Sequence, residues 1–185
     1  MKITEKMWQL GMIEKEEQEF VYFGMIQMIH GILNWFLVIL LGYVFQISIW
    51  QSIFFYFSYC ILRIFAGGYH APTRASCYIC SVLMISVAFA VSQGNLPGVG
   101  ICSMIYLLVF CIIWHYAPID NPNKRLSMVE KIRFRKSTQF VLLLSALFFA
   151  CAVLLCARRV YYTLLLAHIC VCIMLGLGIL QEIRR

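Results

Sequence analysis

Four long stretches without charged residues constrain the fold of this chain more than any other feature of its sequence. No Asp, Glu, Lys or Arg occurs in residues 20–62, 75–119, 137–157 or 160–181. A helix needs roughly 20 apolar residues to cross a bilayer. The first two stretches, of 43 and 45 residues, are long enough for two crossings each, and the last two, of 21 and 22 residues, for one each. We therefore predict an all-α integral membrane protein, a six-span helical bundle in one polytopic domain over residues 1–185.

The connections between the predicted spans are short, which indicates that successive helices are antiparallel neighbours. Residues 1–19 precede the first span and are expected to form either a short amphipathic helix or a solvated helical lead-in. Residues 127–136 are expected to form a separate basic helix along the membrane surface before the fifth span. Little of the chain is left for a domain outside the membrane, which excludes a soluble enzyme and a disulfide-stapled secreted domain. The predicted spans are roughly residues 23–45, 49–65, 77–93, 101–117, 140–156 and 162–180.

The positive charges predict the orientation of the bundle. With this topology, 13 of the 15 Lys and Arg residues lie on one side and only Arg158 and Arg159 lie on the other. Because cytoplasmic loops are enriched in Lys and Arg, both termini and the loops at 63–76 and 118–138 are expected in the cytoplasm. The net charge of +7 is therefore a topology signal, with anionic lipid of the bilayer as a second partner and no nucleic acid expected.

Most Cys and His residues are predicted to be packing residues. Seven of the nine cysteines fall within or at the ends of predicted spans, where a thiol behaves as a small apolar group, so no disulfide framework is indicated. His30, His115 and His168 lie in or beside apolar helices without an acidic partner in any span. We expect such a histidine to be neutral and bonded to a backbone carbonyl.

The segment between the second and third predicted spans carries residues suited to catalysis. Gly67 and Gly68 free the backbone, and Pro72 disfavours the helical conformation of the residue before it. His70 therefore lies in an irregular turn at or just beneath the membrane, and such backbone is tolerated only where protein or water satisfies its polar groups. These breaks allow His70 to fold back over the start of the third span, close to Cys77.

The start of the third span favours a reactive thiolate at Cys77. If Thr73 or Ser76 caps this helix, Cys77 lies in or near its first turn, where free backbone N–H groups and the helix dipole stabilise negative charge. Arg74 adds a positive charge nearby. A thiol in such a field, with His70 able to accept its proton, meets the requirements of an activated nucleophile.

These residues also resemble the signature of the AgrB family, the accessory-gene-regulator membrane endopeptidases. The resemblance extends to the chain length, the six-span layout and the segment APIDNPNK at residues 117–124, and so covers most of the chain. It implies a bacterial multi-pass protein of the cell membrane with its active site at the cytoplasmic face. The residues that match the signature are Arg63, Gly67, Gly68, His70 and Cys77.

The resemblance implies a cysteine peptidase that needs no cofactor or metal. Its partner would be a short AgrD-like precursor, which it converts to a cyclic autoinducing peptide for quorum sensing, with His70 and Cys77 as the catalytic pair. Arg63 and the glycines would serve substrate placement and backbone approach. Asp120 or Asn123 is a candidate to orient His70 if the two cytoplasmic loops meet; otherwise Asp120 is a turn residue. Supporting cations, Arg74 and Lys124 among them, either set topology and bind lipid or dock an acidic stretch of the precursor.

Other functions stay open at this point. Cys77 and Cys80 form a C-x-x-C pair, which is compatible with a membrane thiol oxidoreductase, although the charge bias places it in the reducing cytoplasm. A zinc site at His70, Cys77 and Cys80 lacks a fourth ligand. A non-enzymatic transporter or assembly factor is the broader alternative, and the sequence does not decide whether the chain forms a homodimer.

Overall fold

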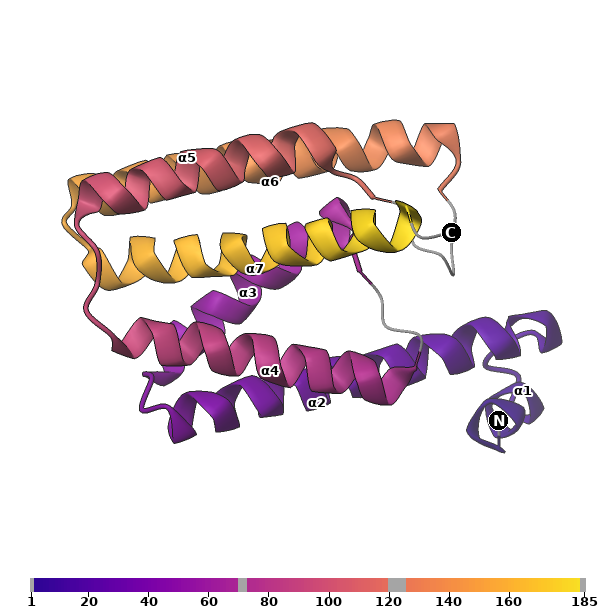
Figure 1. Ribbon diagram of the computed structural model, residues 1–185. Coiled ribbons are helices and arrows are strands. Elements are labelled where there is room, and N and C mark those ends of the chain that lie inside the picture. Colours follow the sequence, from indigo (N-terminus) through magenta and orange to yellow (C-terminus); the bar gives the residue numbers. More distant parts are fainter. Residues whose placement is uncertain (1, 70–72, 120–125, 184–185) are drawn as a thin grey trace. The chain divides into compact units, whose positions relative to one another are not determined.

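The computed structural model describes residues 2–69, 73–119 and 126–183, and these residues form seven α-helices and one short 3₁₀ helix (Figure 1). The all-α prediction is confirmed. The elements are α1 (Lys2–Gln9), η1 (Lys15–Glu17), α2 (Gln18–Val44), α3 (Ile49–Ala66), α4 (Arg74–Gln93), α5 (Val99–Tyr116), α6 (Met128–Leu154) and α7 (Arg158–Ile183).

The chain divides into two compact units, residues 1–38 and residues 39–185. The first unit holds α1, η1 and most of α2. Its helix α1 is short and ends in a turn at Gly11, where φ is +69°, and the Lys15 ammonium lies 5.8 Å from the centre of the Trp8 ring. The second unit holds the end of α2 and helices α3 to α7, and with them the α3–α4 connection.

Five helices in the described part of the chain are long and apolar enough to cross a membrane. They comprise η1 with α2, and then α3, α5, α6 and α7. Within α4, residues 78–93 form a shorter apolar helix. The structure therefore supports five of the predicted spans by length and composition, and the crossing by α4 stays a prediction.

The prediction of a separate basic helix before the fifth span is wrong. The basic segment at 127–136 and the fifth predicted span form one continuous helix, Met128–Leu154, rather than a surface helix followed by a span. Ser127 caps its start by accepting a hydrogen bond from the Glu130 N–H. No Gly or Pro interrupts the junction, and the Thr138 hydroxyl donates to the Phe134 carbonyl within the same helix (2.9 Å). A change from charged to apolar residues does not by itself end a helix, because the backbone hydrogen bonds continue through it.

Helix α7 forms the centre of the second unit. It contacts α3, α4, α5 and α6, and Figure 1 shows α5 and α6 running side by side along it. Near the C-terminal half of α7, apolar residues from several helices form a closed core, which includes Leu62, Ile113, Leu142, Val171 and Leu175. This core fixes the end of α3, from which the candidate site continues.

A chain of polar side chains crosses the middle of the bundle. His168 is 2% exposed; its Nδ1 lies 2.9 Å from the Leu164 carbonyl and its Nε2 lies 3.0 Å from the Ser145 hydroxyl. The same hydroxyl lies 3.1 Å from the Tyr106 hydroxyl. The expectation that His168 bonds to a backbone carbonyl is confirmed, and the network links α5, α6 and α7.

The loops of the second unit gather at two opposite ends. At one end, the Gln93 amide donates to the Phe45 carbonyl, and Arg158 donates to the Leu96 carbonyl and to the Pro97 carbonyl (3.4 Å). The end of α3, the start of α4 and the segment after α5 lie at the other end (Figure 1). Within this unit, the described ends of the two loops that the charge pattern assigns to the cytoplasm therefore share one end.

Candidate functional site

The last turn of α3 leads directly into the glycine pair of the motif. Gly67 ends the helix with φ +69° and ψ −151°, and its N–H donates to the Arg63 carbonyl at 3.2 Å. Gly68 follows with φ +119°. Side chains strongly disfavour such conformations, so the glycine pair is needed for the chain to leave α3 in this direction. The predicted backbone break is confirmed at both glycines.

The segment after α3 pairs with the segment after α5. Gly67 and Ile119 form a parallel β-bridge, in which the Ile119 N–H donates to the Ala66 carbonyl at 3.1 Å. The two backbones approach so closely that a Cβ atom at Gly67 would lie 2.2 Å from the Ile119 oxygen. The two loops that the sequence predicts on one side of the membrane therefore meet, one residue before Asp120.

Arg63 holds this segment from the side of α3. Its guanidinium donates to the Gly67 carbonyl and to the Tyr69 carbonyl, the latter at 2.5 Å. One planar cation thus joins two backbone oxygens of the segment that ends one residue before His70.

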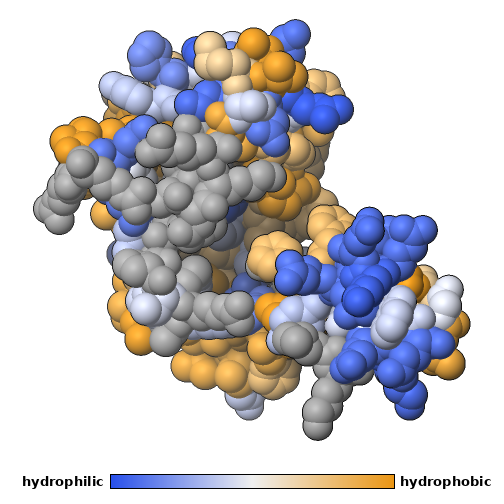
Figure 2. Space-filling model, turned by 90° about the vertical axis from the view of Figure 1, so that its right-hand side faces the viewer, coloured by the Kyte–Doolittle hydropathy of each residue, from blue (hydrophilic) through white to orange (hydrophobic). Residues whose placement is uncertain are grey.

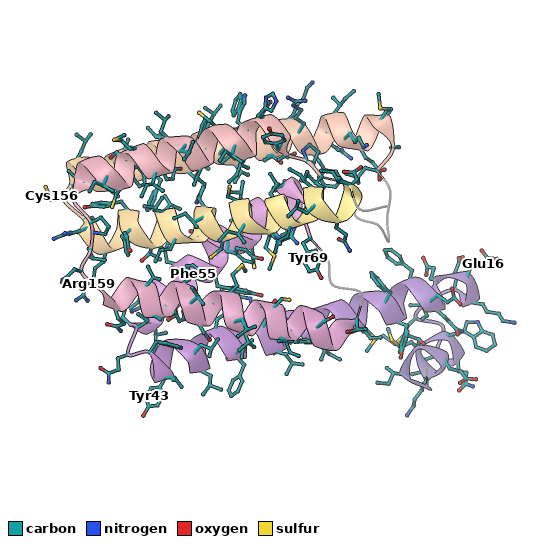
Figure 3. All side chains as sticks on the ribbon, in the orientation of Figure 1. Glu16, Tyr43, Phe55, Tyr69, Cys156 and Arg159 are labelled. Atoms are coloured by element: carbon teal, nitrogen blue, oxygen red, sulfur yellow. The ribbon has the colours of Figure 1, made fainter. Side chains whose placement is uncertain are left out.

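Helix α7 holds the same segment from another side. The Tyr69 N–H donates to the Met174 carbonyl at 2.8 Å. One helical turn further along, Gly178 faces the backbone of Gly68 and Tyr69. Figure 3 shows Tyr69 beside the C-terminal half of α7, at the opposite end of the unit from Cys156 and Arg159.

The start of α4 is capped, so the condition that the sequence analysis set for Cys77 is fulfilled. The Thr73 hydroxyl accepts a hydrogen bond from the Ser76 N–H (3.2 Å), and the Ser76 hydroxyl accepts one from the Thr73 N–H (3.3 Å). This reciprocal arrangement is a capping box, which fixes where a helix begins. Cys77 follows Ser76 and therefore lies at the end of the first turn, where the positive end of the helix dipole acts.

The described residues cover part of the predicted site. The structure brings Arg63, Gly67 and Gly68 together. His70, Pro72, Asp120, Asn123 and Lys124 lie outside the described residues, as do the side chains of Arg74 and Cys77.

Two residues that the sequence analysis did not single out contact the motif, namely Met174 and Gly178. Both lie far from the motif in the sequence, on a helix that has no charged residue between positions 160 and 181. The only sequence signal was the pair Gly176 and Gly178 in the last predicted span. Paired small residues in a span allow close backbone approach, although they do not say what approaches.

An apolar cavity of about 460 Å³ lies elsewhere in the unit, between α3, α6 and α7. Phe54, Leu144 and Phe148 line it, with Ser145 and His168 among its polar lining residues. Of the described motif residues, none of Arg63, Gly67 and Gly68 lines this cavity. Its size therefore gives no reason to move the candidate site away from the α3–α4 connection.

Positive charge gathers beside the candidate site. Arg133, Arg135 and Lys136 on the first turns of α6 are exposed. Figure 2 looks onto this end and shows hydrophilic residues, interspersed with hydrophobic ones, over the upper part, where the start of α6 lies. This surface suits anionic lipid headgroups or an acidic peptide segment.

The fold and the motif together define a class: a polytopic, all-helical membrane protein in which the segment at residues 67–69 is held by α3, by the segment after α5 and by the last helix. Over residues 1–181 the sequence matches the family described as accessory gene regulator B, and the chain therefore belongs to the AgrB family. Membership implies a part in the processing of an AgrD precursor in Agr quorum sensing.

Two relatives from Clostridium perfringens support this assignment. A protein of strain 13 (type A) described as AgrB-like protein 2 is 26% identical over 153 residues, which cover 79% of this chain and 71% of the relative. An AgrB-like protein of strain SM101 is 24% identical over the same shares of the two chains. No solved structure matches the chain.

Proposed function

We propose that this protein is a membrane-embedded cysteine endopeptidase with His70 and Cys77 as its catalytic pair. It removes the C-terminal part of a short AgrD-like precursor and helps to close the remaining part into a cyclic lactone or thiolactone. The observation that carries the proposal is that the backbone is fixed shortly before each of the two residues. The segment before His70 is bonded to α3, α7 and Ile119, and a capping box fixes the helix start before Cys77.

The proposed reaction has two acyl-transfer steps. His70 accepts the Cys77 proton, and the thiolate attacks the scissile carbonyl of the precursor. The peptide C–N bond then breaks, His70 returns the proton to the leaving amine, and the N-terminal part remains on Cys77 as a thioester. A cysteine or serine within that part attacks the thioester carbonyl, which closes the ring and releases the Cys77 thiol.

Exclusion of water determines whether ring closure or hydrolysis follows. Exchange of one thioester for another is nearly balanced in free energy, whereas attack by water is irreversible. A site at the end of an apolar bundle limits the access of water to the intermediate. This supports cyclisation as the outcome, with Arg63, Gly67 and Gly68 as supporting residues that fix the backbone.

Asp120 is the proposed partner of the His70 imidazole. Its neighbour Ile119 is paired with Gly67, so the condition that the two loops meet is fulfilled at the adjacent residue. A carboxylate that accepts a hydrogen bond from one imidazole nitrogen leaves the other free to take the thiol proton. Arg74 and Lys124 are proposed as nearby cations that favour the thiolate and the negatively charged parts of the precursor.

The membrane topology belongs to the same proposal. We propose that α4 also crosses the membrane, as the third of six spans, and that both termini and the catalytic loops face the cytoplasm. The gathering of the α3–α4 and α5–α6 loops at one end of the unit supports this orientation, as does the distribution of Lys and Arg. The exposed cations of α6 then lie next to anionic lipid or an acidic stretch of the precursor.

Co-expression with a candidate small precursor encoded near the gene of this protein tests the function. Precursor and product are followed by mass spectrometry for wild type, Cys77→Ala, His70→Ala and Cys80→Ala. We expect processing to be abolished in the first two variants and retained in the third. Equal loss in Cys80→Ala favours thiol redox or metal chemistry over a peptidase, and unimpaired processing by Cys77→Ala contradicts the proposed mechanism.

A further inference from the structure

The last helix approaches the motif with its backbone rather than with a side chain. A Cβ atom built on Gly178 would lie 2.9 Å from both the Gly68 carbonyl carbon and the Tyr69 nitrogen, and 3.0 Å from the Gly68 Cα. These neighbours are backbone atoms, so no side-chain rotation relieves the overlap. Gly178 is buried, and the missing side chain is the reason that the segment can lie against α7.

The Gly68–Tyr69 backbone packs closely against one face of α7 only. Gly176 lies two residues earlier on the same helix, and a Cβ atom built there would have no neighbour within 4 Å. The Met174 carbonyl, on the Gly178 face, accepts the hydrogen bond from the Tyr69 N–H. Gly178 and Met174 on this face of α7 touch the Gly68–Tyr69 backbone, and Gly176 does not. We call the packing of that backbone against Gly178 and Met174 the α7 contact.

We propose that Gly178 is a positioning residue that sets the place of His70 by letting the Gly68–Tyr69 backbone rest on α7. The inference rests on the proposed function, because it assigns a role in a reaction carried out by His70. Arg63 binds the segment at the Gly67 and Tyr69 carbonyls, and Ile119 binds it at Ala66. Met174 and Gly178 contact the Gly68–Tyr69 peptide group, which directly precedes the peptide group that joins Tyr69 to His70.

A side chain at position 178 would displace the Gly68–Tyr69 backbone by a measurable distance. Ordinary contacts of a Cβ atom lie at 3.4–4 Å, so an alanine at 178 must displace the segment by roughly 0.5–1 Å from its present 2.9 Å. A misplacement of about 1 Å in catalytic geometry can cost about 100-fold in rate. We expect Gly178→Ala to lower kcat by about 10- to 100-fold, with KM little changed, because the contact touches no part of the precursor.

Gly176→Ala is the matched control. Alanine is a better helix former than glycine, so helix propensity alone predicts that neither variant is impaired. Both variants are reconstituted in lipid, and kcat and KM are measured on the precursor. Exchange of the Tyr69 amide hydrogen is measured in parallel, because its hydrogen bond to Met174 protects it and its loss does not depend on activity.

Faster exchange at Tyr69 and a lower kcat in Gly178→Ala alone support the proposal. Wild-type kcat in Gly178→Ala overturns it, and so does equal impairment in both variants. If the wild-type protein cleaves no precursor, the proposed function fails. Hydrogen exchange then still tests whether Gly178 positions the segment. Loss of Tyr69 amide protection in Gly178→Ala alone supports the α7 contact, and unchanged protection refutes it.

Discussion

Replacing Arg63 tests whether its guanidinium organises the catalytic segment or binds the precursor. The guanidinium reaches the Gly67 and Tyr69 carbonyls at the same time. Lysine keeps the charge but has one nitrogen on a flexible chain, so it cannot reproduce this planar fork. Arg63→Lys should therefore lose one of the two hydrogen bonds, and Arg63→Ala should lose both.

The size of the effect follows from these bonds. A hydrogen bond from a charged group contributes about 1.5–3 kcal/mol, which corresponds to a change of about 10- to 150-fold in the population of the bonded segment. Arg63 is half-buried, so water competes for its donors and the lower end applies. We expect kcat to fall about 10-fold in Arg63→Lys and further in Arg63→Ala, with KM unchanged.

The assay is steady-state cleavage of the precursor by protein reconstituted in lipid nanodiscs. Arg159→Lys and Arg159→Ala are the matched controls, because Arg159 is exposed at the opposite end of the unit (Figure 3). A raised KM with unchanged kcat in the Arg63 variants refutes the reasoning, because it shows that the guanidinium contacts the precursor instead. Full activity of Arg63→Lys refutes it as well.

Two further predictions concern the backbone and the core. Gly67→Ala should reduce processing at least about tenfold, because alanine is strained by about 1–3 kcal/mol at this φ and ψ and its Cβ would meet the Ile119 oxygen, whereas Gly100→Ala, with open space around it, should leave processing unchanged. Activity of Gly67→Ala equal to that of Gly100→Ala contradicts this account of the glycine. Ser145→Ala removes the hydroxyl bonded to His168, and because such bonds between helices in membranes contribute about 0.6–1.7 kcal/mol, we expect a lower thermal midpoint in detergent with kcat unchanged. An unchanged midpoint, or a selective loss of kcat, contradicts that role.

The helices and the motif backbone were predictable because strong local signals set them. Charge-free stretches indicated the long helices, the glycine pair indicated the break after α3, and Thr73 and Ser76 indicated the start of α4. Each of these signals acts over a few residues, through backbone freedom or capping. The continuous helix α6 was not predicted, because the change from basic to apolar residues was read as a boundary although no helix-breaking residue is present.

The contact of the motif with α7 could not be predicted. Helix α7 is apolar all round, so no periodic pattern marks which face meets a neighbour, and Met174 takes part only through its carbonyl. A backbone group carries no sequence signature. The same holds for the pairing of Gly67 with Ile119, which depends on where two helices end in space. The orientation in the membrane and the catalytic roles stay predictions.

Trapping the acyl-enzyme tests the central claim most directly. The precursor is altered so that its ring-forming cysteine or serine is replaced by alanine, which blocks the second step and lets the first intermediate accumulate. The proposed mechanism predicts that peptide mass spectrometry finds the N-terminal part of the precursor attached to Cys77, that hydroxylamine releases it, and that Cys77→Ala carries none. Cleavage of this precursor without an adduct, or with an adduct on another residue, contradicts the account.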